Sequence, residues 1–240
     1  MLNLQMQEMI VALVQPFYPT NIGYVARVMK NFGLQKLVLV EPKAQVKEAM
    51  KFASHGSHIL EEATVVTKEQ LFRNYDLIIG TTAIPAKKSS NLARSAITPA
   101  DFAERSVQLT TGTCLLLGRD TTGLTRSELD RCDLVIHIPT TTDYETLNVS
   151  HALAIILYEL SKVKHSTGVK TASKIQRERL VSLATRLAQM AGVQHHKISQ
   201  LRSGLRKMLG RSPITEREAF LLMGLLRRSA SAIQRFVRYA

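Results

Sequence analysis

The chain lacks tryptophan, contains only two cysteines and is poor in aromatic residues, which make up 5% of its 240 positions. Two cysteines are too few for a metal site of their own, and we interpret Cys114 and Cys132 as buried structural thiols. No apolar run approaches the roughly 20 residues of a transmembrane helix. No basic region followed by an apolar stretch and a small-residue cleavage site opens the chain. We therefore expect a cytoplasmic protein without a membrane partner or a bound metal.

Two common nucleotide-binding motifs are also missing. No Gly-x-Gly-x-x-Gly follows the first predicted strand, and no Walker A motif occurs in the chain. The acidic ribose ligand of dinucleotide-binding folds is missing too. These absences argue against an ordinary nucleotide-dependent oxidoreductase.

The positive charge is concentrated in the last third of the chain. The net charge is +13; residues 165–240 carry 15 Lys and Arg against 3 Asp and Glu, whereas residues 1–164 carry 17 against 16. This asymmetry is typical of a polyanion-binding module joined to a near-neutral domain. A membrane surface would require one segregated amphipathic helix, but the basic residues spread over several predicted helices. A solvated basic surface without a partner stays open as the plainer alternative.

Short apolar runs alternate with helical patterns over most of the first 162 residues. The predicted strands are apolar throughout, which is typical of a parallel sheet covered by helices on both faces. A helix is predicted at residues 21–31, with Thr20 or Asn21 as its N-cap, and residues 125–128 fit a capping box. The main predicted strands cover residues 9–14, 36–40, 77–80, 113–117 and 134–138.

A short polar segment divides the chain. We predict an α/β domain over residues 1–163, a linker over residues 164–171, and a small all-helical, basic RNA-binding domain over residues 172–240. The last segment is expected to form three helices, at about residues 173–192, 195–209 and 213–238. Its predicted phosphate contacts are Arg202, Arg206 and Lys207.

Four motifs accompany the predicted strands. They are Asn-Ile-Gly-Tyr-Val-Ala-Arg at 21–27, Gly-Thr-Thr-Ala at 80–83, Leu-Gly-Arg-Asp-Thr-Thr-Gly-Leu at 117–124, and a segment at 138–150 that contains Thr-Leu-Asn. Open α/β sheets bind ligands at the carboxyl ends of their strands, so this placement predicts a small-molecule pocket. In this order the motifs resemble those of the SPOUT superfamily of RNA methyltransferases, in its TrmH-like branch, over about residues 9–162.

The resemblance implies an α/β fold with a C-terminal trefoil knot and S-adenosylmethionine as the cofactor. Taken singly, three of the matching residues have plainer interpretations: an ordinary turn for Gly118, a helix cap for Asn148 and simple core for Ile138. By position, the resemblance implies a cofactor site formed by Thr81, Thr82, Ala83, Leu117, Gly118, Ile138, Glu145, Thr146, Leu147 and Asn148.

Arg27 matches the catalytic arginine of that family. Because a guanidinium does not readily lose a proton, we expect Arg27 to fix a phosphate and stabilise the developing alkoxide, while a phosphate oxygen or water accepts the proton. Asn21, Asp120 and Asn148 complete the predicted catalytic set, although Asn21 could equally be only a helix cap. Asp120 and Thr146 stand where the family usually has Glu and Ser, which leaves substrate choice open.

Further RNA contacts are expected from cations near these motifs. Besides Arg27, they are Lys87, Lys88, Arg94 and Arg119, and for the first three a plain surface loop is the alternative. The resemblance also implies a homodimer that methylates a ribose 2′-hydroxyl of tRNA. The implied target is the first nucleotide of the anticodon loop, a cytidine, with uridine as a second candidate. Methylation of ribosomal RNA and a non-enzymatic RNA-binding module remain the alternatives; both Arg27 and Asn148 are present, which favours an enzyme.

Overall fold

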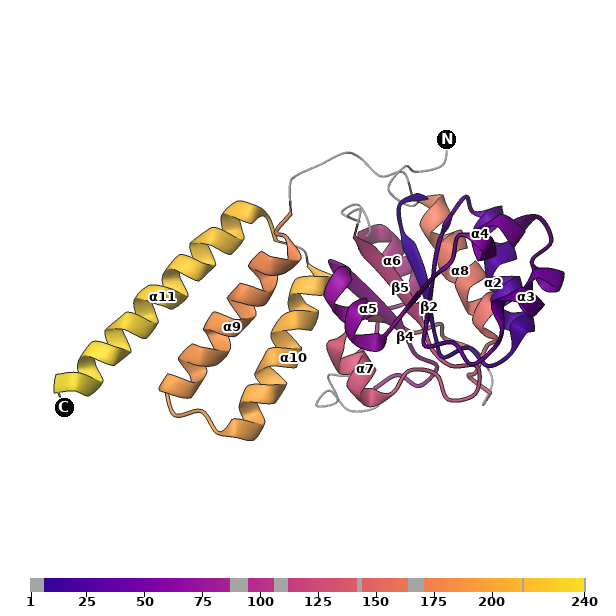
Figure 1. Ribbon diagram of the computed structural model, residues 1–240. Coiled ribbons are helices and arrows are strands. Elements are labelled where there is room, and N and C mark those ends of the chain that lie inside the picture. Colours follow the sequence, from indigo (N-terminus) through magenta and orange to yellow (C-terminus); the bar gives the residue numbers. More distant parts are fainter. Residues whose placement is uncertain are drawn as a thin grey trace. The chain divides into compact units, whose positions relative to one another are not determined.

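The computed structural model describes residues 7–86, 95–105, 112–141, 144–163, 171–212 and 214–239. The chain folds into two compact units, residues 1–167 (unit 1) and residues 168–240 (unit 2) (Figure 1). Across the described residues, no helix is long and apolar enough to cross a membrane.

Unit 1 is built on a six-stranded sheet in the order β3-β2-β1-β5-β4-β6, with every pair of neighbours parallel. This arrangement confirms the predicted parallel sheet. The strand β3 lacks an apolar run, and for that reason the sequence did not predict it. The strands are β1 (Ile10–Val14), β2 (Lys36–Val40), β3 (Thr64–Val66), β4 (Leu77–Thr81), β5 (Thr113–Leu117) and β6 (Leu134–Ile136).

Successive side chains of a strand point to opposite faces of the sheet. Both sets of side chains are buried, so helices cover both faces. On one face, Val11, Leu13 and Leu115 pack against apolar residues of α2, α3, α4, α6 and α8. On the other face, Ala12 and Leu116 pack against residues of α5 and α7, together with both cysteines. Cys114 and Cys132 are fully buried, as the sequence predicted, and burial raises the pKa of the Cys114 thiol. The helices of unit 1 are α2 (Pro19–Asn31), α3 (Val46–Ala53), α4 (Ser57–Glu61), α5 (Lys68–Asn74), α6 (Pro99–Arg105), α7 (Arg126–Arg131) and α8 (Val149–Lys162), with a 3-10 turn at Ser54–Gly56.

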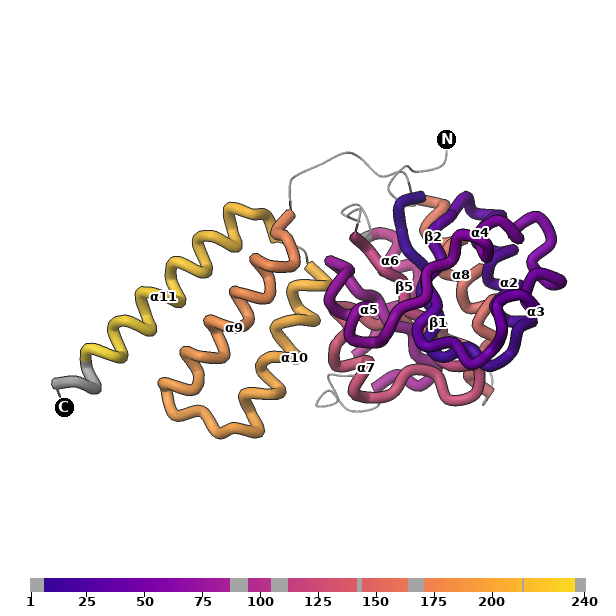
Figure 2. Tube along the Cα trace, viewed as in Figure 1, coloured from indigo at the N-terminus to yellow at the C-terminus, as the bar shows by residue number. Residues whose placement is uncertain are grey.

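The N-terminal ends of α2 and α7 differ in how well the sequence predicted them. Helix α2 begins two residues earlier than predicted: Tyr18 is its N-cap, without a side-chain cap bond, and Pro19 takes the first helical position that proline favours. The predicted cap at Thr20 or Asn21 is therefore wrong, which frees the Asn21 side chain for other contacts. The predicted capping box between Thr125 and Glu128 is present at the start of α7. Helix α2 packs against α8, so two helices that are more than a hundred residues apart in the chain lie side by side (Figure 2).

Unit 2 consists of α9 (Lys174–Met190), α10 (His195–Arg211) and α11 (Glu216–Tyr239). A small apolar core of Leu180, Val181, Leu209 and Met223 joins them. Helix α11 begins later than the predicted residue 213, because Thr215 and Glu218 exchange hydrogen bonds that cap it at Glu216.

Candidate cofactor pocket and active site

A cavity of about 210 Å³ lies at the carboxyl ends of β4, β5 and β6. Its walls come from the segments that follow these strands and from the first two turns of α8, so three of the four sequence motifs meet there. Asn148 is the only predicted cofactor residue that does not line it. The predicted residues in the wall are Thr81, Thr82, Ala83, Leu117, Gly118, Ile138, Glu145, Thr146 and Leu147.

The turn after β5 is closed by two backbone hydrogen bonds, from Arg119 N to Gly123 O at 3.3 Å and from Gly123 N to Arg119 O at 3.0 Å. Gly118 lies directly against this turn. A Cβ at Gly118 would lie 2.3 Å from the Gly123 carbonyl carbon and 2.4 Å from Leu124 N, closer than any side chain tolerates. A glycine at position 118 is thus needed to fold this wall of the cavity.

The segment after β4 forms another part of the wall. The Thr82 N–H donates to Ile136 O at 3.0 Å, and the Thr82 hydroxyl accepts from Ile84 N at 3.2 Å. The Thr81 hydroxyl reaches back to Leu116 O at 3.3 Å. These bonds fix the backbone at the ends of three adjacent strands, so the cavity is bounded by rigid turns.

A chain of side-chain hydrogen bonds connects the rim of the cavity to the start of α2. Asp120, which lines the cavity, accepts from Asn21 Nδ2 at 2.6 Å and from the backbone N–H groups of Phe17 and Tyr18 at 2.8 and 3.1 Å. Asn148 Nδ2 donates to Asn21 Oδ1 at 2.9 Å. Asn21, Asp120 and Asn148 thus form one polar cluster.

Asn148 has a second role in this cluster. Its Oδ1 accepts from the Ser150 N–H at 2.9 Å and so caps the N-terminus of α8. The side chain is therefore occupied at both ends, by the helix cap and by Asn21. The structure accordingly favours the helix-cap interpretation of Asn148 over a direct cofactor contact.

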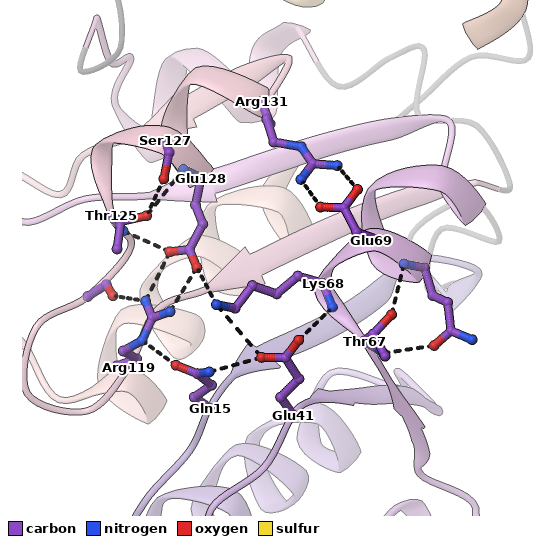
Figure 3. A network of polar contacts seen from close by, with 12 residues as sticks. Gln15, Glu41, Thr67, Lys68, Glu69, Arg119, Thr125, Ser127, Glu128 and Arg131 are labelled. Atoms are coloured by element: carbon purple, nitrogen blue, oxygen red, sulfur yellow. Dashed lines mark hydrogen bonds and ion pairs between the residues drawn. The ribbon is translucent and has the colours of Figure 1, made fainter.

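Arg119 belongs to a partly buried ion pair (Figure 3). Its guanidinium donates to both Glu128 oxygens at 2.8 and 2.9 Å, to Gln15 Oε1 at 2.8 Å and to Gly123 O at 3.1 Å. With four hydrogen bonds from its five N–H groups and its side chain 17% exposed, Arg119 holds the turn after β5 together. We therefore replace the predicted RNA contact of Arg119 with this structural role.

The ion pair shifts the pKa values of both Glu128 and Arg119 toward their charged forms. Burial alone raises the pKa of Glu128, but hydrogen bonds from Arg119 and Thr125, together with attraction to the guanidinium, outweigh it and lower the pKa to about 2. The same hydrogen bond raises the pKa of Arg119. Both groups therefore stay charged at neutral pH.

Two residues with left-handed backbone extend this network. Gln15 and Glu41 have φ values of 45° and 48° and follow β1 and β2 directly. Gln15 Nε2 donates to Glu41 at 2.9 Å, and Lys68 Nζ lies 3.7 Å from Glu41 and 3.9 Å from Glu128. Such backbone costs roughly 1–3 kcal/mol per residue and persists only where its surroundings enforce it. The network thus ties the ends of β1, β2 and β5 to the starts of α5 and α7.

Comparison with known proteins identifies the family. Residues 8–158 match the SpoU rRNA methylase family. The chain belongs to the SpoU methylase family. Among the relatives of this SpoU methylase, the tRNA (cytidine-2′-O-)-methyltransferase TrmJ of Methanocaldococcus jannaschii is 33% identical over 221 residues, which cover 89% of this chain and 96% of the relative. The tRNA (cytidine/uridine/adenosine-2′-O-)-methyltransferase TrmJ of Pseudomonas aeruginosa is 30% identical over 238 residues, 90% of this chain and 91% of the relative.

A solved structure shares the fold of this SpoU methylase. The crystal structure of TrmJ from Z. mobilis ZM4 superposes with a TM-score of 0.69 over 91% of this chain and 97% of that chain. Its sequence is 24% identical, so this likeness shows a shared fold and nothing more.

The cations predicted to contact RNA near the motifs of this SpoU methylase do not all lie at the cavity. Arg27 is exposed two turns into α2 and does not line the cavity. Lys87, Lys88 and Arg94 lie outside the described residues.

The three cations predicted on α10 differ in their surroundings. Arg202 is exposed and Arg206 is partly buried, whereas Lys207 is only 2% exposed. A buried ammonium does not reach a phosphate, so the predicted RNA contact of Lys207 is withdrawn.

Several wall residues of this SpoU methylase were not predicted. Thr121–Leu124 belong to the third motif, and their place in the tight turn shows only in the structure. Val149, Ala152 and Ile156 recur at helical spacing on α8, a pattern that the sequence also uses for plain core. The unpredicted wall residues are Ile84, Thr121, Thr122, Gly123, Leu124, Ile136, Val149, Ala152 and Ile156.

Proposed function

We propose that this SpoU methylase transfers the methyl group of S-adenosylmethionine to a ribose 2′-hydroxyl of tRNA. The observation that carries the proposal is the convergence of three motif segments on one cavity at the strand ends. The two relatives that span nearly the whole chain both carry names for 2′-O-methylation of tRNA. The basic unit 2 supplies the positive charge that a polyanionic substrate requires.

The cavity fits the proposed cofactor in its chemistry. Leu117, Ile138 and Leu147 offer apolar walls for a flat purine, and fixed backbone turns at Thr82 and Gly118 surround them. Glu145 adds a carboxylate that suits a cationic ligand or ribose hydroxyls. When bound, the cofactor supplies an activated methyl group on a sulfonium.

Within the polar cluster, Asp120 and Asn148 hold Asn21 at the start of α2. Arg27, two turns further along that helix, fixes the phosphate of the acceptor nucleotide and stabilises negative charge on the 2′-oxygen. We propose a homodimer in which Arg27 of one copy faces the cavity of the other, because Arg27 is exposed and lies outside the wall of its own cavity.

A trefoil knot is part of the same proposal. Ile136 of β6 pairs with Thr81 of β4 and also with Ile97, both in parallel. The backbone of β6 is therefore bonded on its two sides to both ends of the segment that leaves β4. A strand that pairs with both ends of an earlier segment is what a chain threaded through that segment would show. This geometry supports the knot.

The target within tRNA is proposed to be the first nucleotide of the anticodon loop, cytidine or uridine. Ribosomal RNA is the second candidate, because the matching family is described as rRNA methylases. Incubation of the purified protein with tritiated S-adenosylmethionine and equal amounts of total tRNA or total ribosomal RNA separates the two. Radiolabel in tRNA, mapped to a 2′-O-methylribose, is the expected result. Label only in ribosomal RNA would select the alternative, and cofactor binding without transfer to either would indicate a non-enzymatic module.

The role of Arg27 is tested in the same assay. Arg27→Ala should abolish turnover and leave cofactor affinity by calorimetry nearly unchanged, because Arg27 lies outside the cavity wall. Arg27→Lys should also fail, since a point charge does not replace a planar fork. An equal loss of affinity and turnover in Arg27→Ala would refute the assignment.

A further inference from the structure

Two aromatic rings stand exposed where β1 passes into α2. Phe17 is 62% and Tyr18 45% exposed, although every apolar side chain of β1 itself is buried. The rings contact each other edge to face, with centroids 5.2 Å apart and planes at 87°. Helix packing does not explain the pair, because Phe17 precedes α2 and Tyr18 is only its N-cap.

The segment that carries the rings is held rigidly. Pro16 and Pro19 flank them and restrict the backbone. The carbonyl of Pro16 accepts from the N–H groups of Lys43 and Ala44, each at 3.0 Å. The N–H groups of Phe17 and Tyr18 both donate to Asp120. A fixed segment with exposed rings has already lost the entropy that binding would otherwise cost.

The position of the rings is defined by Asp120. This carboxylate lines the cofactor cavity and bonds the backbone of both aromatic residues, so the rings lie at the rim of the cavity. A substrate whose ribose reaches the cavity must place another part of its nucleotide near that rim. The Asp120 charge opposes a phosphate there, whereas a neutral base is accepted. Lys43 is exposed next to this segment and offers a cation for the backbone of the substrate.

We infer that the Phe17 ring, supported at its edge by Tyr18, is a stacking platform for the base of the acceptor nucleotide. This inference rests on the proposed RNA methyltransferase function. Stacking on an aromatic ring accepts any base, since every base has a π-face, and is worth roughly 1–3 kcal/mol per base. The platform would orient the nucleotide so that its 2′-hydroxyl faces the cavity, and the bonds to Asp120 make it a direct extension of the cofactor site.

Steady-state methylation of tRNA with Phe17→Leu and Phe17→Trp tests the platform. Leucine keeps the apolar bulk but removes the π-face, so KM for tRNA should rise about 5- to 150-fold, the equivalent of roughly 1–3 kcal/mol. Tryptophan should keep KM near the wild-type value. Affinity for S-adenosylmethionine, measured by calorimetry, should not change in either variant. Val65→Ala, which trims an exposed apolar residue on the edge strand β3, is the matched control and should behave as wild type.

The possible results are distinguishable. A wild-type KM in Phe17→Leu would overturn the platform. A shift of Phe17→Leu to a smaller species in sedimentation, with activity lost in proportion, would show that the rings pack against a second copy of the chain and would overturn it too. If the wild-type protein transfers no methyl group to any RNA, the proposed function fails and the platform with it. If the wild-type enzyme methylates tRNA and Phe17→Leu does so with the same KM, the platform is refuted and the proposed function stands.

Discussion

Replacing Glu128 by glutamine removes the negative charge that Arg119 contacts in the turn after β5. Glutamine has nearly the same shape and keeps one oxygen to accept the Thr125 N–H of the capping box. The variant therefore isolates the charge of the pair. Arg119 remains 17% exposed and loses its counter-charge, a situation that is costly in a protein interior.

The size of the effect follows from the pKa of Glu128. Each pKa unit corresponds to about 1.36 kcal/mol, so the fall from 4.5 to about 2 gives an upper limit of about 3 kcal/mol. Because the folded-state pKa is depressed, this stability is fully present above the unfolded-state value and is lost as the pH falls through about 2. The difference between wild type and Glu128→Gln should accordingly be at most about 3 kcal/mol at pH 7 and at most about 2 kcal/mol at pH 3.5.

Urea unfolding followed by hydrogen exchange and mass spectrometry measures this difference for unit 1, if peptides of β1 and β5 are monitored. Glu69→Gln is the matched control, since Glu69 also forms a two-bond pair with an arginine, Arg131, but is 72% exposed. Its loss should be far smaller, because solvent screens exposed pairs. A difference for Glu128→Gln below about 1 kcal/mol, or one that stays constant between pH 7 and pH 3.5, would refute the reasoning.

Two further predictions concern the cavity and the basic unit. Gly118→Ala should reduce affinity for S-adenosylmethionine more than about tenfold in calorimetry, because its Cβ would meet the backbone of Gly123 and Leu124; Gly224→Ala, with nothing within 4 Å of the added Cβ, is the control, and equal affinity in both variants would contradict the model of the turn. Arg202→Gln should weaken tRNA binding at every salt concentration and lower the slope of log affinity against log salt by roughly 0.7–0.9, as expected for one lost phosphate contact; an unchanged slope in a KCl titration would remove Arg202 from the RNA surface.

The sequence predicted the sheet better than it predicted the contacts around the cavity. Continuous apolar runs revealed the strands that are buried on both faces, whereas Thr64–Val66 is short and exposed and gave no such signal. The sequence also did not predict the order of the strands, since β5 inserts between β1 and β4 by long-range pairing. Patterns of hydrophobicity report which residues are buried but not which strand is the neighbour.

The polar contacts of the site depend on residues that are far apart in the chain. Asn148 and Asn21 are separated by 127 positions, and Arg119 and Gln15 by 104. The family resemblance put Asn21, Asp120 and Asn148 in one catalytic set, but it did not show which atoms bond. The charge of Arg119 and Lys207 predicted RNA contacts, and the structure shows that an ion pair occupies one and burial removes the other.

The pairing of β1 with β5 has a consequence for how the protein is made. Ile10 lies opposite Cys114, so the central ladder of the sheet forms between segments about a hundred residues apart. During synthesis β1 emerges long before its partner β5, so one edge of β1 stays unpaired in the meantime. Parallel sheets with such distant pairings fold slowly and are exposed to aggregation. Production of this chain should therefore benefit from slow translation, low temperature or chaperones.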